Sequence, residues 1–488
     1  MQNKFTVTNR FIKSEARNCF FLLFFLFFPF AVFSQSLDNS LVDTLASTRR
    51  VLIDNIFLTG NKKTKDRIIL RELSIEKGGA YSFEALEEII IADRNKIYNT
   101  KLFNEVEVAI LELDFDKVDI VINVTERWYL FPIPLLDIID RNFNDWWVNH
   151  DADLSRLIYG LSLYHFNMRG MNERMTVTAQ FGFTKKFEVN YSMPYIDRSQ
   201  RHGLSFSAKY LEYNNLHYKT IENKRVFVET EDLLRTTLGF GVSYTLRNSF
   251  YTRHSFGVDY NKNTVADTVL LLNPNYLGTG ANEQNILKLN YSYSVDRRDI
   301  AAYPLDGYSF SIGIDHIGFG LKNSVYRTSF QTSYAKYFDL KKGFYFNSLV
   351  SVNLSTPPEQ PYTLLSGLGF SNRLVRGYEL YTIFAQNYFL NKSTFKKAVF
   401  RGSTKWKSMP LEQFQYIPYA LYLKTYVDFG YATNTENLEG NAHLSDRWLA
   451  GAGFGLDFVT MYDFVIRAEY SFNNIGESGF FLSLTSDF

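Results

Sequence analysis

From residue 128 to the C-terminus, apolar and polar positions alternate in short segments separated by turn residues. Examples of these segments are 157–166, 175–183, 202–213, 307–317 and 480–488. In the last of them, Phe480, Leu482, Leu484 and Phe488 share one face, whereas Ser483, Thr485 and Asp487 share the other. A period of two predicts β-strands with one apolar and one polar face. Helical periodicity is absent from this part of the chain.

Two segments indicate which residues face water. In residues 422–430 the apolar Leu423, Val427 and Phe429 alternate with Tyr422, Lys424, Tyr426 and Asp428. In residues 464–472 the apolar set is opposed by Arg467 and Glu469. A soluble β-sandwich would show the same alternation. The sequence is 17% aromatic, however, and a membrane barrel needs such an excess for its two interfacial girdles. We therefore expect a mainly β protein, a transmembrane antiparallel β-barrel.

The segments number about sixteen when residues 129–140 are taken as the first. An even number places both ends of the barrel on one side of the membrane. Short turns such as 340–343 and 460–463 then lie on that side, and long loops such as 262–283 and 357–381 lie opposite. One stretch fits this scheme poorly, because residues 395–417 are basic and long for a short turn.

The first segment contains Pro132 and Pro134. Proline cannot donate a hydrogen bond to a neighbouring strand, so it is tolerated at an edge or where pairing is incomplete. If this strand meets residues 479–488 to close the barrel, the seam between them should be weak. The alternative is that residues 129–150 are only a linker.

Residues 51–127 have the pattern of a small soluble α+β domain. Residues 51–61 predict a strand that ends in a Gly-Asn turn, residues 64–73 a helix, and Leu86 to about Tyr98 a second helix. Two alternating strands follow, at 106–113 and 117–127. The remaining residues, 128–488, are assigned to the barrel.

The N-terminal residues have the pattern of an export signal. An apolar run at 20–33 is shorter than a membrane-spanning helix and follows Lys4, Arg10, Lys13 and Arg17. We expect residues 1–34 to be a signal peptide, Gln35 the new N-terminus, and 35–50 a linker. Cys19, the single cysteine, precedes most of the apolar run, which disfavours a lipoprotein. The mature chain is then expected to have no disulfide and no cysteine metal site.

The remaining chemistry favours neither an enzyme nor a nucleic-acid-binding protein. The formal net charge of +1 is too small for a general nucleic-acid binder. The seven histidines lack metal-ligand spacing, and no Gly-x-Ser-x-Gly motif occurs. The glycines at 451, 453 and 455 are not a dinucleotide fingerprint, because no helix follows them. We expect no catalytic residues, no metal and no cofactor.

Several motifs resemble the BamA/TamA superfamily of outer-membrane proteins, in which polypeptide-transport-associated (POTRA) domains precede a sixteen-stranded barrel. Residues 51–127 look like one POTRA domain. Residues 294–313 are similar to the family's strand-turn motif, and residues 375–378 to the signature of its sixth extracellular loop. The residues that carry the resemblance are Asp296, Arg297, Asp299, Pro304 and Gly307 in the first motif, Val375, Arg376, Gly377 and Tyr378 in the second, and Phe488 as a C-terminal targeting signal.

The resemblance implies that the loop after the eleventh strand folds into the barrel lumen. There Arg376 would reach Asp428, which belongs to an Asp-x-Gly element ending at Gly430. The alternation derived above independently places Asp428 on the polar face. Arginine suits this role because its guanidinium can bind a carboxylate through two hydrogen bonds. Gly451, Gly453 and Gly455 are expected to leave space for the loop.

The resemblance also implies a function. The protein would be an assembly or translocation barrel of the bacterial outer membrane, with its POTRA-like domain in the periplasm, and would insert or export clients through a lateral seam or the lumen. Its expected partners are outer-membrane lipids, unfolded client barrels or exported polypeptides, and periplasmic chaperones or accessory lipoproteins. A single POTRA domain departs from the main assembly factor and favours a specialised or accessory role. A passive porin or receptor barrel is the alternative.

Overall fold

The computed structural model describes residues 49–138, 154, 157–182, 184–369, 373–410, 414–434 and 443–485. The proposed signal peptide, nearly all of the proposed linker and Phe488 lie outside these ranges. Within the described residues, every helix is too short or too polar to cross a membrane.

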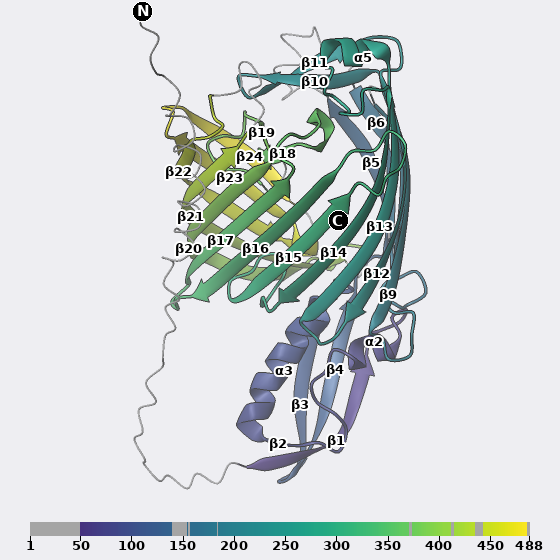
Figure 1. Cartoon of the computed structure of the whole chain (residues 1–488). Coiled ribbons are helices and arrows are strands. Elements are labelled where there is room, and N and C mark those ends of the chain that lie inside the picture. The colour runs from purple at the N-terminus through teal and green to yellow at the C-terminus, as the bar shows by residue number, and fades with distance from the viewer. Residues whose placement is uncertain are drawn as a thin grey trace, which may run out of the picture. The chain divides into compact units, whose positions relative to one another are not determined.

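The N-terminal domain is a four-stranded sheet with two helices (Figure 1). The strand order is β2-β1-β4-β3, in which β1 runs parallel to β4. The elements are β1 (Arg50–Thr59), α2 (Asp66–Leu70), β2 (Ala80–Ser82), α3 (Phe83–Tyr98), β3 (Phe103–Asp114) and β4 (Lys117–Glu126). The predicted order of main elements is confirmed, and the short β2 is an addition.

Helix α2 is shorter than predicted. It ends at Leu70, and the chain continues in tight turns in which Glu72 N donates to Ile69 O and Leu73 N to Leu70 O. The apolar spacing that predicted a longer helix is still used, because Ile68, Ile69 and Leu73 all lie in the domain core. Burial of these side chains requires only one helical turn followed by a bend.

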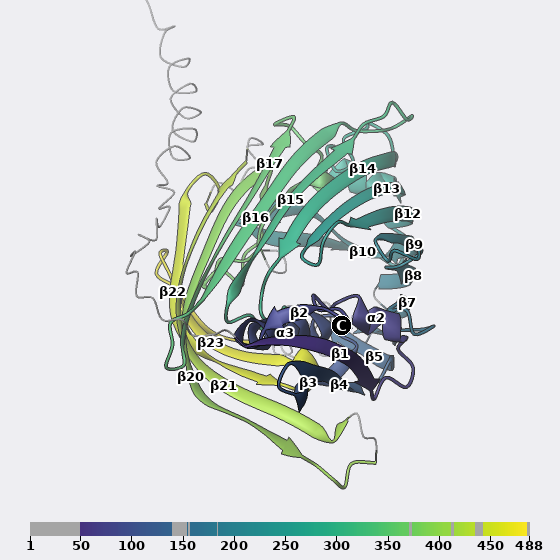
Figure 2. The same ribbon diagram turned by 90° about the horizontal axis from the view of Figure 1, so that it is seen from below.

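Most of the described residues from Leu130 onward form a sixteen-stranded antiparallel sheet, as the segment count predicted. The sheet curves around a central space when it is seen from below (Figure 2). Its strands are β5 (Leu130–Ile138), β6 (Leu157–Phe166), β7 (Arg174–Gly182), β8 (Thr184–Met193), β9 (His202–Tyr213), β12 (Arg235–Arg247), β13 (Thr252–Val265), β14 (Glu283–Asp296), β15 (Gly307–Ile317), β16 (Arg327–Asp339), β17 (Phe344–Thr356), β20 (Asn387–Lys405), β21 (Tyr416–Thr433), β22 (Trp448–Thr460), β23 (Val465–Asn473) and β24 (Ser478–Thr485).

The two faces of the strands differ as predicted. On β21, Leu423, Val427 and Phe429 are exposed, whereas Lys424 and Asp428 are buried. The same alternation on β12 exposes Leu238, Phe240 and Val242. Exposed apolar side chains on the convex face and buried polar ones inside are the pattern of a barrel in lipid.

Strands β5 and β24 are the two ends of the sheet, and no hydrogen-bonded pairing joins them within the described residues. Strand β5 pairs with β6 along its whole length, so the linker alternative is wrong for residues 130–138. Pro132 and Pro134 therefore lie on an edge strand, where a missing donor costs little. We call the unpaired junction between β5 and β24 the seam.

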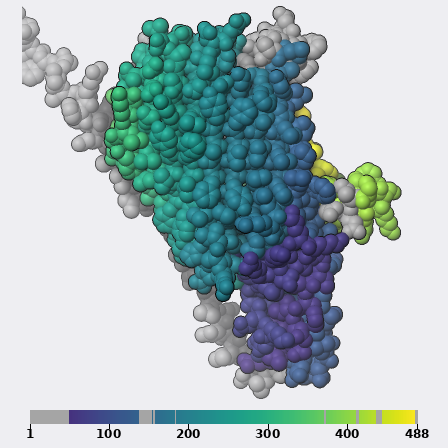
Figure 3. Space-filling model, turned by 90° about the vertical axis from the view of Figure 1, so that its right-hand side faces the viewer, coloured from purple at the N-terminus to yellow at the C-terminus, as the bar shows by residue number. Residues whose placement is uncertain are grey.

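Most of the stretch 395–417, which was too long for a short turn, belongs to strands β20 and β21. They have 19 and 18 residues, and their pairing continues to Lys405 opposite Tyr416. The basic stretch is therefore a strand extension and not a long turn. The hairpin stands out from the surface as a yellow-green projection (Figure 3).

The long connections pack together at the end of the barrel that lies opposite the N-terminal domain (Figure 1). They contain the hairpin of β10 (Asn215–Ile221) and β11 (Lys224–Glu229), the helix α5 (Asp267–Leu272), and the short strands β18 (Ser366–Leu368) and β19 (Ile383–Ala385). Leu216, Val269, Tyr276, Tyr362 and Phe384 belong to one buried cluster that joins these connections. The hairpin and α5 were not predicted.

Candidate functional site

The loop between β17 and β20 brings Arg376 against the inner wall of the barrel. Its guanidinium binds Asp428 on β21 through two hydrogen bonds, from Nε to Oδ2 at 2.8 Å and from Nη2 to Oδ1 at 2.6 Å. The backbone N–H of Arg376 donates to the same carboxylate at 3.1 Å. Asp428 is fully buried, with 0% of its surface exposed. The structure thus brings together the two residues that the sequence paired.

Two further strands contribute to the surroundings of Arg376. Its Nη2 donates to Thr394 Oγ1 on β20 at 3.0 Å, and its Nη1 lies 3.5 Å from Glu469 Oε1 on β23. The guanidinium also lies 3.8 Å from the ring centre of Tyr426. Charge-assisted hydrogen bonds and a cation–π contact together hold the loop to three strands of the wall.

Glycines allow the loop to approach this closely. A Cβ on Gly451 would lie 1.7 Å from the carbonyl oxygen of Arg376, and one on Gly430 would lie 2.5 Å from Val375 Cγ2. Gly377 has a φ of +94°, which side-chain-bearing residues rarely adopt. The atoms nearest to a Cβ on Gly453 or Gly455 belong to β23 and β21 and not to the loop. A direct contact with the loop therefore confirms the expected role for Gly451, and the role of the other two stays a prediction.

The neighbouring residues of the motif anchor the loop to the turn between β23 and β24. Tyr378 donates its hydroxyl hydrogen to Asn474, and Asn473 Nδ2 donates to Gly377 O at 2.7 Å. Val375 and Tyr378 are almost fully buried in a small apolar cluster with Leu390 and Leu449. All four residues of the Val-Arg-Gly-Tyr motif therefore have a structural role.

An ion network beside this pair was not predicted. Lys424 is buried on β21 between Asp457 Oδ1 at 2.5 Å and Glu469 Oε1 at 2.8 Å. The alternation placed Lys424 and Glu469 on the polar face. It could not show that they meet, because they lie on strands that are not adjacent in the sheet.

The residues of the strand-turn motif stabilise the connection between β14 and β15. Asp296 binds Arg298 at 2.5 Å, and Arg297 lies 4.8 Å from the ring centre of Tyr251. Asp299 Oδ1 accepts a hydrogen bond from Leu305 N at 3.0 Å, beside Pro304. Gly307 has a φ of +97°. This motif lies at the end of the barrel that carries the N-terminal domain, because Asn99 of that domain contacts its backbone.

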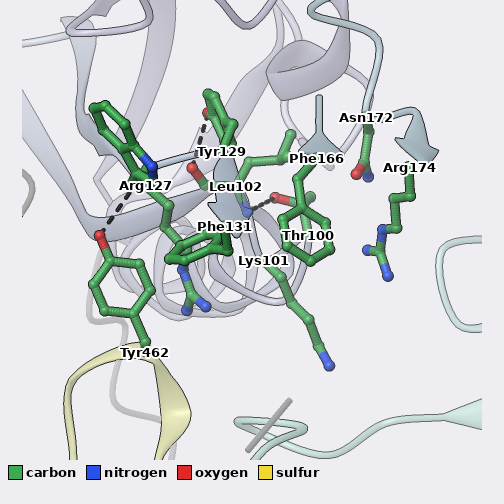
Figure 4. A pocket seen from close by; sticks show the side chains of 11 residues that line it. Thr100, Lys101, Leu102, Arg127, Tyr129, Phe131, Phe166, Asn172, Arg174 and Tyr462 are labelled. Carbon is green, nitrogen blue, oxygen red and sulfur yellow. Dashed lines mark hydrogen bonds between the residues drawn. The ribbon is translucent and has the colours of Figure 1, made fainter. Parts of the chain in front are cut away.

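At the same end of the barrel, residues of the N-terminal domain contact the turn before β23, on the other side of the seam. Arg127, which precedes β5, forms an ion pair of 2.9 Å with Asp463, which precedes β23. Tyr98 also donates to Asp463, and burial raises the pKa of Tyr98 to about 12. Figure 4 shows Tyr462 and Phe131 in the wall of a pocket at this junction, and their ring centres are 5.7 Å apart.

Metal-binding clusters are not found in the described ranges, where no group of three or more His, Cys, Asp or Glu side chains converges.

Comparisons with known proteins give a consistent picture. The Omp85 superfamily domain model matches residues 167–485, and the POTRA model, described as a surface antigen variable number repeat, matches residues 51–127. The outer membrane protein assembly factor BamA of Buchnera aphidicola is 22% identical over 251 residues, which are 51% of this chain. The matched stretch spans only 36% of that relative's length.

Two solved structures share the fold. One is BamA from Haemophilus ducreyi lacking POTRA domains 1–3, with a TM-score of 0.51 and 15% identity over 89% of this chain and 85% of that one. The other is CdiB from Escherichia coli, with a TM-score of 0.52 and 10% identity over 89% of this chain and 75% of that one. The identities are low, so these structures support the architecture and not a particular activity.

Proposed function

Because this chain belongs to the Omp85 superfamily, we propose that it is a barrel of the bacterial outer membrane that assembles or translocates client polypeptides, with its POTRA domain in the periplasm. The observation that carries this proposal is the seam. Strands β5 and β24 each lack a partner on one side within the described residues. An unpaired strand edge is a template on which another strand can add by β-augmentation.

The lumen loop supports an assembly barrel over a passive porin. Arg376 and the motif around it are held inside the barrel by three strands. A porin needs an open, water-filled lumen, and a loop bound in this way obstructs it. A reconstituted bilayer should therefore show low, fluctuating conductance and not steady porin currents.

The POTRA domain offers a second strand edge. Strand β3 has twelve residues and β4 is its one strand partner in the described domain, whereas the carbonyl oxygens of Phe103 and Val106 accept from Arg127 and Arg94. The edge that a client strand could join is therefore the C-terminal part of β3. Leu111 and Leu113 are exposed on this strand, which suits an extended client or a partner with apolar side chains. Periplasmic chaperones or accessory lipoproteins are proposed as further partners of this edge. One POTRA domain favours a specialised insertase, exporter or accessory barrel.

Depletion of the protein in the bacterium that encodes it tests this function. The abundance of each outer-membrane protein would be measured by quantitative mass spectrometry as the protein is lost. We expect a defined subset of outer-membrane or exported proteins to fall and to return when the gene is restored. An unchanged set, together with loss of uptake of a small solute, would show a porin instead.

A further inference from the structure

The turn at 297–306 extends from the periplasmic rim into the barrel and buries Tyr303 there. The exposed fraction of Tyr303 is 7%, although it lies in a connection between strands. Its hydroxyl donates to Asp457 Oδ2 on β22 at 2.8 Å. Its ring lies 5.0 Å from that of Tyr422 and 4.1 Å from the ammonium of Lys396. A buried tyrosine with its hydroxyl satisfied is a specific anchor and not a loose contact.

The same turn is bound to the POTRA domain at its other side. Asn99, at the C-terminal end of α3, donates from Nδ2 to Asp299 O at 2.9 Å and accepts from Ala301 N at 3.0 Å. A side-chain amide that makes both bonds to one backbone segment fixes its position and its orientation. The turn is internally rigid as well, because Arg298 Nη1 donates to Ala301 O at 3.0 Å.

Beyond Tyr303, the ion network leads to the lumen loop. Asp457 binds Lys424, Lys424 binds Glu469, and Glu469 lies 3.5 Å from the guanidinium of Arg376. All of these side chains are almost fully buried. In such surroundings ion pairs are poorly screened, and a displaced partner leaves a charge uncompensated. The contacts therefore form an unbroken series from the POTRA domain to the Val-Arg-Gly-Tyr loop.

We propose that Tyr303 is a positioning residue through which the POTRA domain controls how firmly the lumen loop is held. The inference rests on the proposed function, since it describes how binding of a client to the POTRA domain reaches the barrel interior. Movement of α3 shifts the turn through Asn99, withdraws the Tyr303 hydroxyl from Asp457, and weakens the ion network that supports Arg376. The test measures this coupling directly.

The test uses the purified full chain in detergent, without client, and compares Tyr303→Phe, Asn99→Ala and the double variant. The readout is the rate of trypsin cleavage after Arg376, identified by mass spectrometry. The rate is normalised to cleavage after Lys341, whose side chain is 81% exposed. Heat-modifiable migration on gels shows whether each barrel has assembled.

Two matched controls separate coupling from general loosening. Tyr345→Phe removes a hydroxyl from the same aromatic cluster, where Tyr345 accepts from Arg401 and not from the ion network. Asn104→Ala removes a different POTRA contact with the barrel, to Tyr462 at 3.4 Å. Neither control should change the normalised cleavage rate.

We expect each single variant to raise cleavage after Arg376 about tenfold, and the double variant to raise it no further than the larger single effect. Multiplying effects in the double variant, or an unchanged rate for either single variant, would overturn the proposal. If Tyr303→Phe fails to assemble, Asn99→Ala compared with Asn104→Ala decides the outcome. Because no client is present, failure here leaves the proposed function standing, and failure of the depletion test leaves these rates unaffected.

Discussion

Arg376 binds the barrel wall through several polar contacts at once. One side chain satisfies a buried carboxylate twice, contacts a second carboxylate and packs on an aromatic ring. Lysine could not reproduce this arrangement, because its ammonium is a point charge without a planar fork. Asp428, with no exposed surface, depends equally on its partner.

Removing one partner of this pair should therefore be costly. We expect Arg376→Ala or Asp428→Asn to lower the free energy of unfolding in urea by roughly 3 to 5 kcal/mol, because the remaining group stays buried and loses its bidentate partner. The double variant Arg376→Ala/Asp428→Asn should cost less than the sum of its two single variants. Lys262→Ala, which removes one partner of an ion pair with Glu283 whose two side chains are 41% and 38% exposed, serves as the control and should have a small effect. Full additivity would show that the two residues act separately.

Gly451 gives a second test at the scale of single atoms. Gly451→Ala places a methyl group where the carbonyl oxygen of Arg376 now lies, so the loop must move away from the wall. We expect the loop to become accessible to trypsin while β22 still forms. Gly313→Ala on β15 is the matched control, since the nearest atom to its added Cβ is 3.9 Å away. Equal protection of the loop in both variants would contradict the assigned contact.

The sequence predicted the contact of Arg376 with Asp428 because a recognisable motif and a period of two pointed to the same side chain. It did not predict Lys424 as the centre of the ion network, or Tyr303 as a buried anchor. These contacts depend on strands that are distant in sequence and on how far one turn reaches into the lumen. Neither quantity is encoded in a local pattern.

At the scale of elements, the β10–β11 hairpin packs into the cluster of long connections at the barrel end opposite the N-terminal domain. His217 of β10 packs among the rings of Phe227, Tyr362 and Phe384. Burial, followed by the charges of Arg225 and Arg235, lowers the pKa of His217 to about 4. The imidazole is therefore neutral in the folded hairpin at neutral pH.

This burial predicts a pH dependence with a definite sign. In the unfolded hairpin, His217 is protonated below its ordinary pKa of 6.5. In the folded hairpin, His217 stays neutral until the pH falls to about 4. The stability of the hairpin is thus full above pH 6.5 and falls between pH 6.5 and 4, by at most about 3 kcal/mol. Hydrogen–deuterium exchange of residues 215–229, corrected for intrinsic rates, should accelerate over this range. His217→Gln should remove the pH dependence, and a slope that persists in this variant would assign it elsewhere.

Regular strands were the elements that the sequence predicted best. The segments 157–166, 202–213 and 307–317 coincide with β6, β9 and β15. Their boundaries are marked by turn residues, and each strand is buried on one face only. The prediction was weaker where tertiary contacts decide the outcome, as in the single turn of α2 and in the β10–β11 hairpin, which is stabilised by neighbouring loops.

At the scale of the whole molecule, the number of strands and their inward and outward faces follow from the alternation, but the state of the seam does not. Two prolines indicated a weak junction, and the sheet ends at β5 and β24 without pairing them within the described residues. Whether two edges pair depends on the curvature accumulated over sixteen strands, which no single segment determines. The POTRA domain spans this junction through Arg127 and Asp463.

The central claim is that clients engage the barrel at the seam. A photoactivatable phenylalanine analogue would be placed at Leu482 of β24, which is 69% exposed, or at Leu238 of β12, which is 40% exposed and faces the same apolar surroundings away from the seam. Illumination of a complex with an outer-membrane client whose assembly has been stopped part-way should crosslink position 482, and not position 238, to the client. Crosslinks of equal yield from both positions, or from neither while assembly proceeds, would contradict the claim.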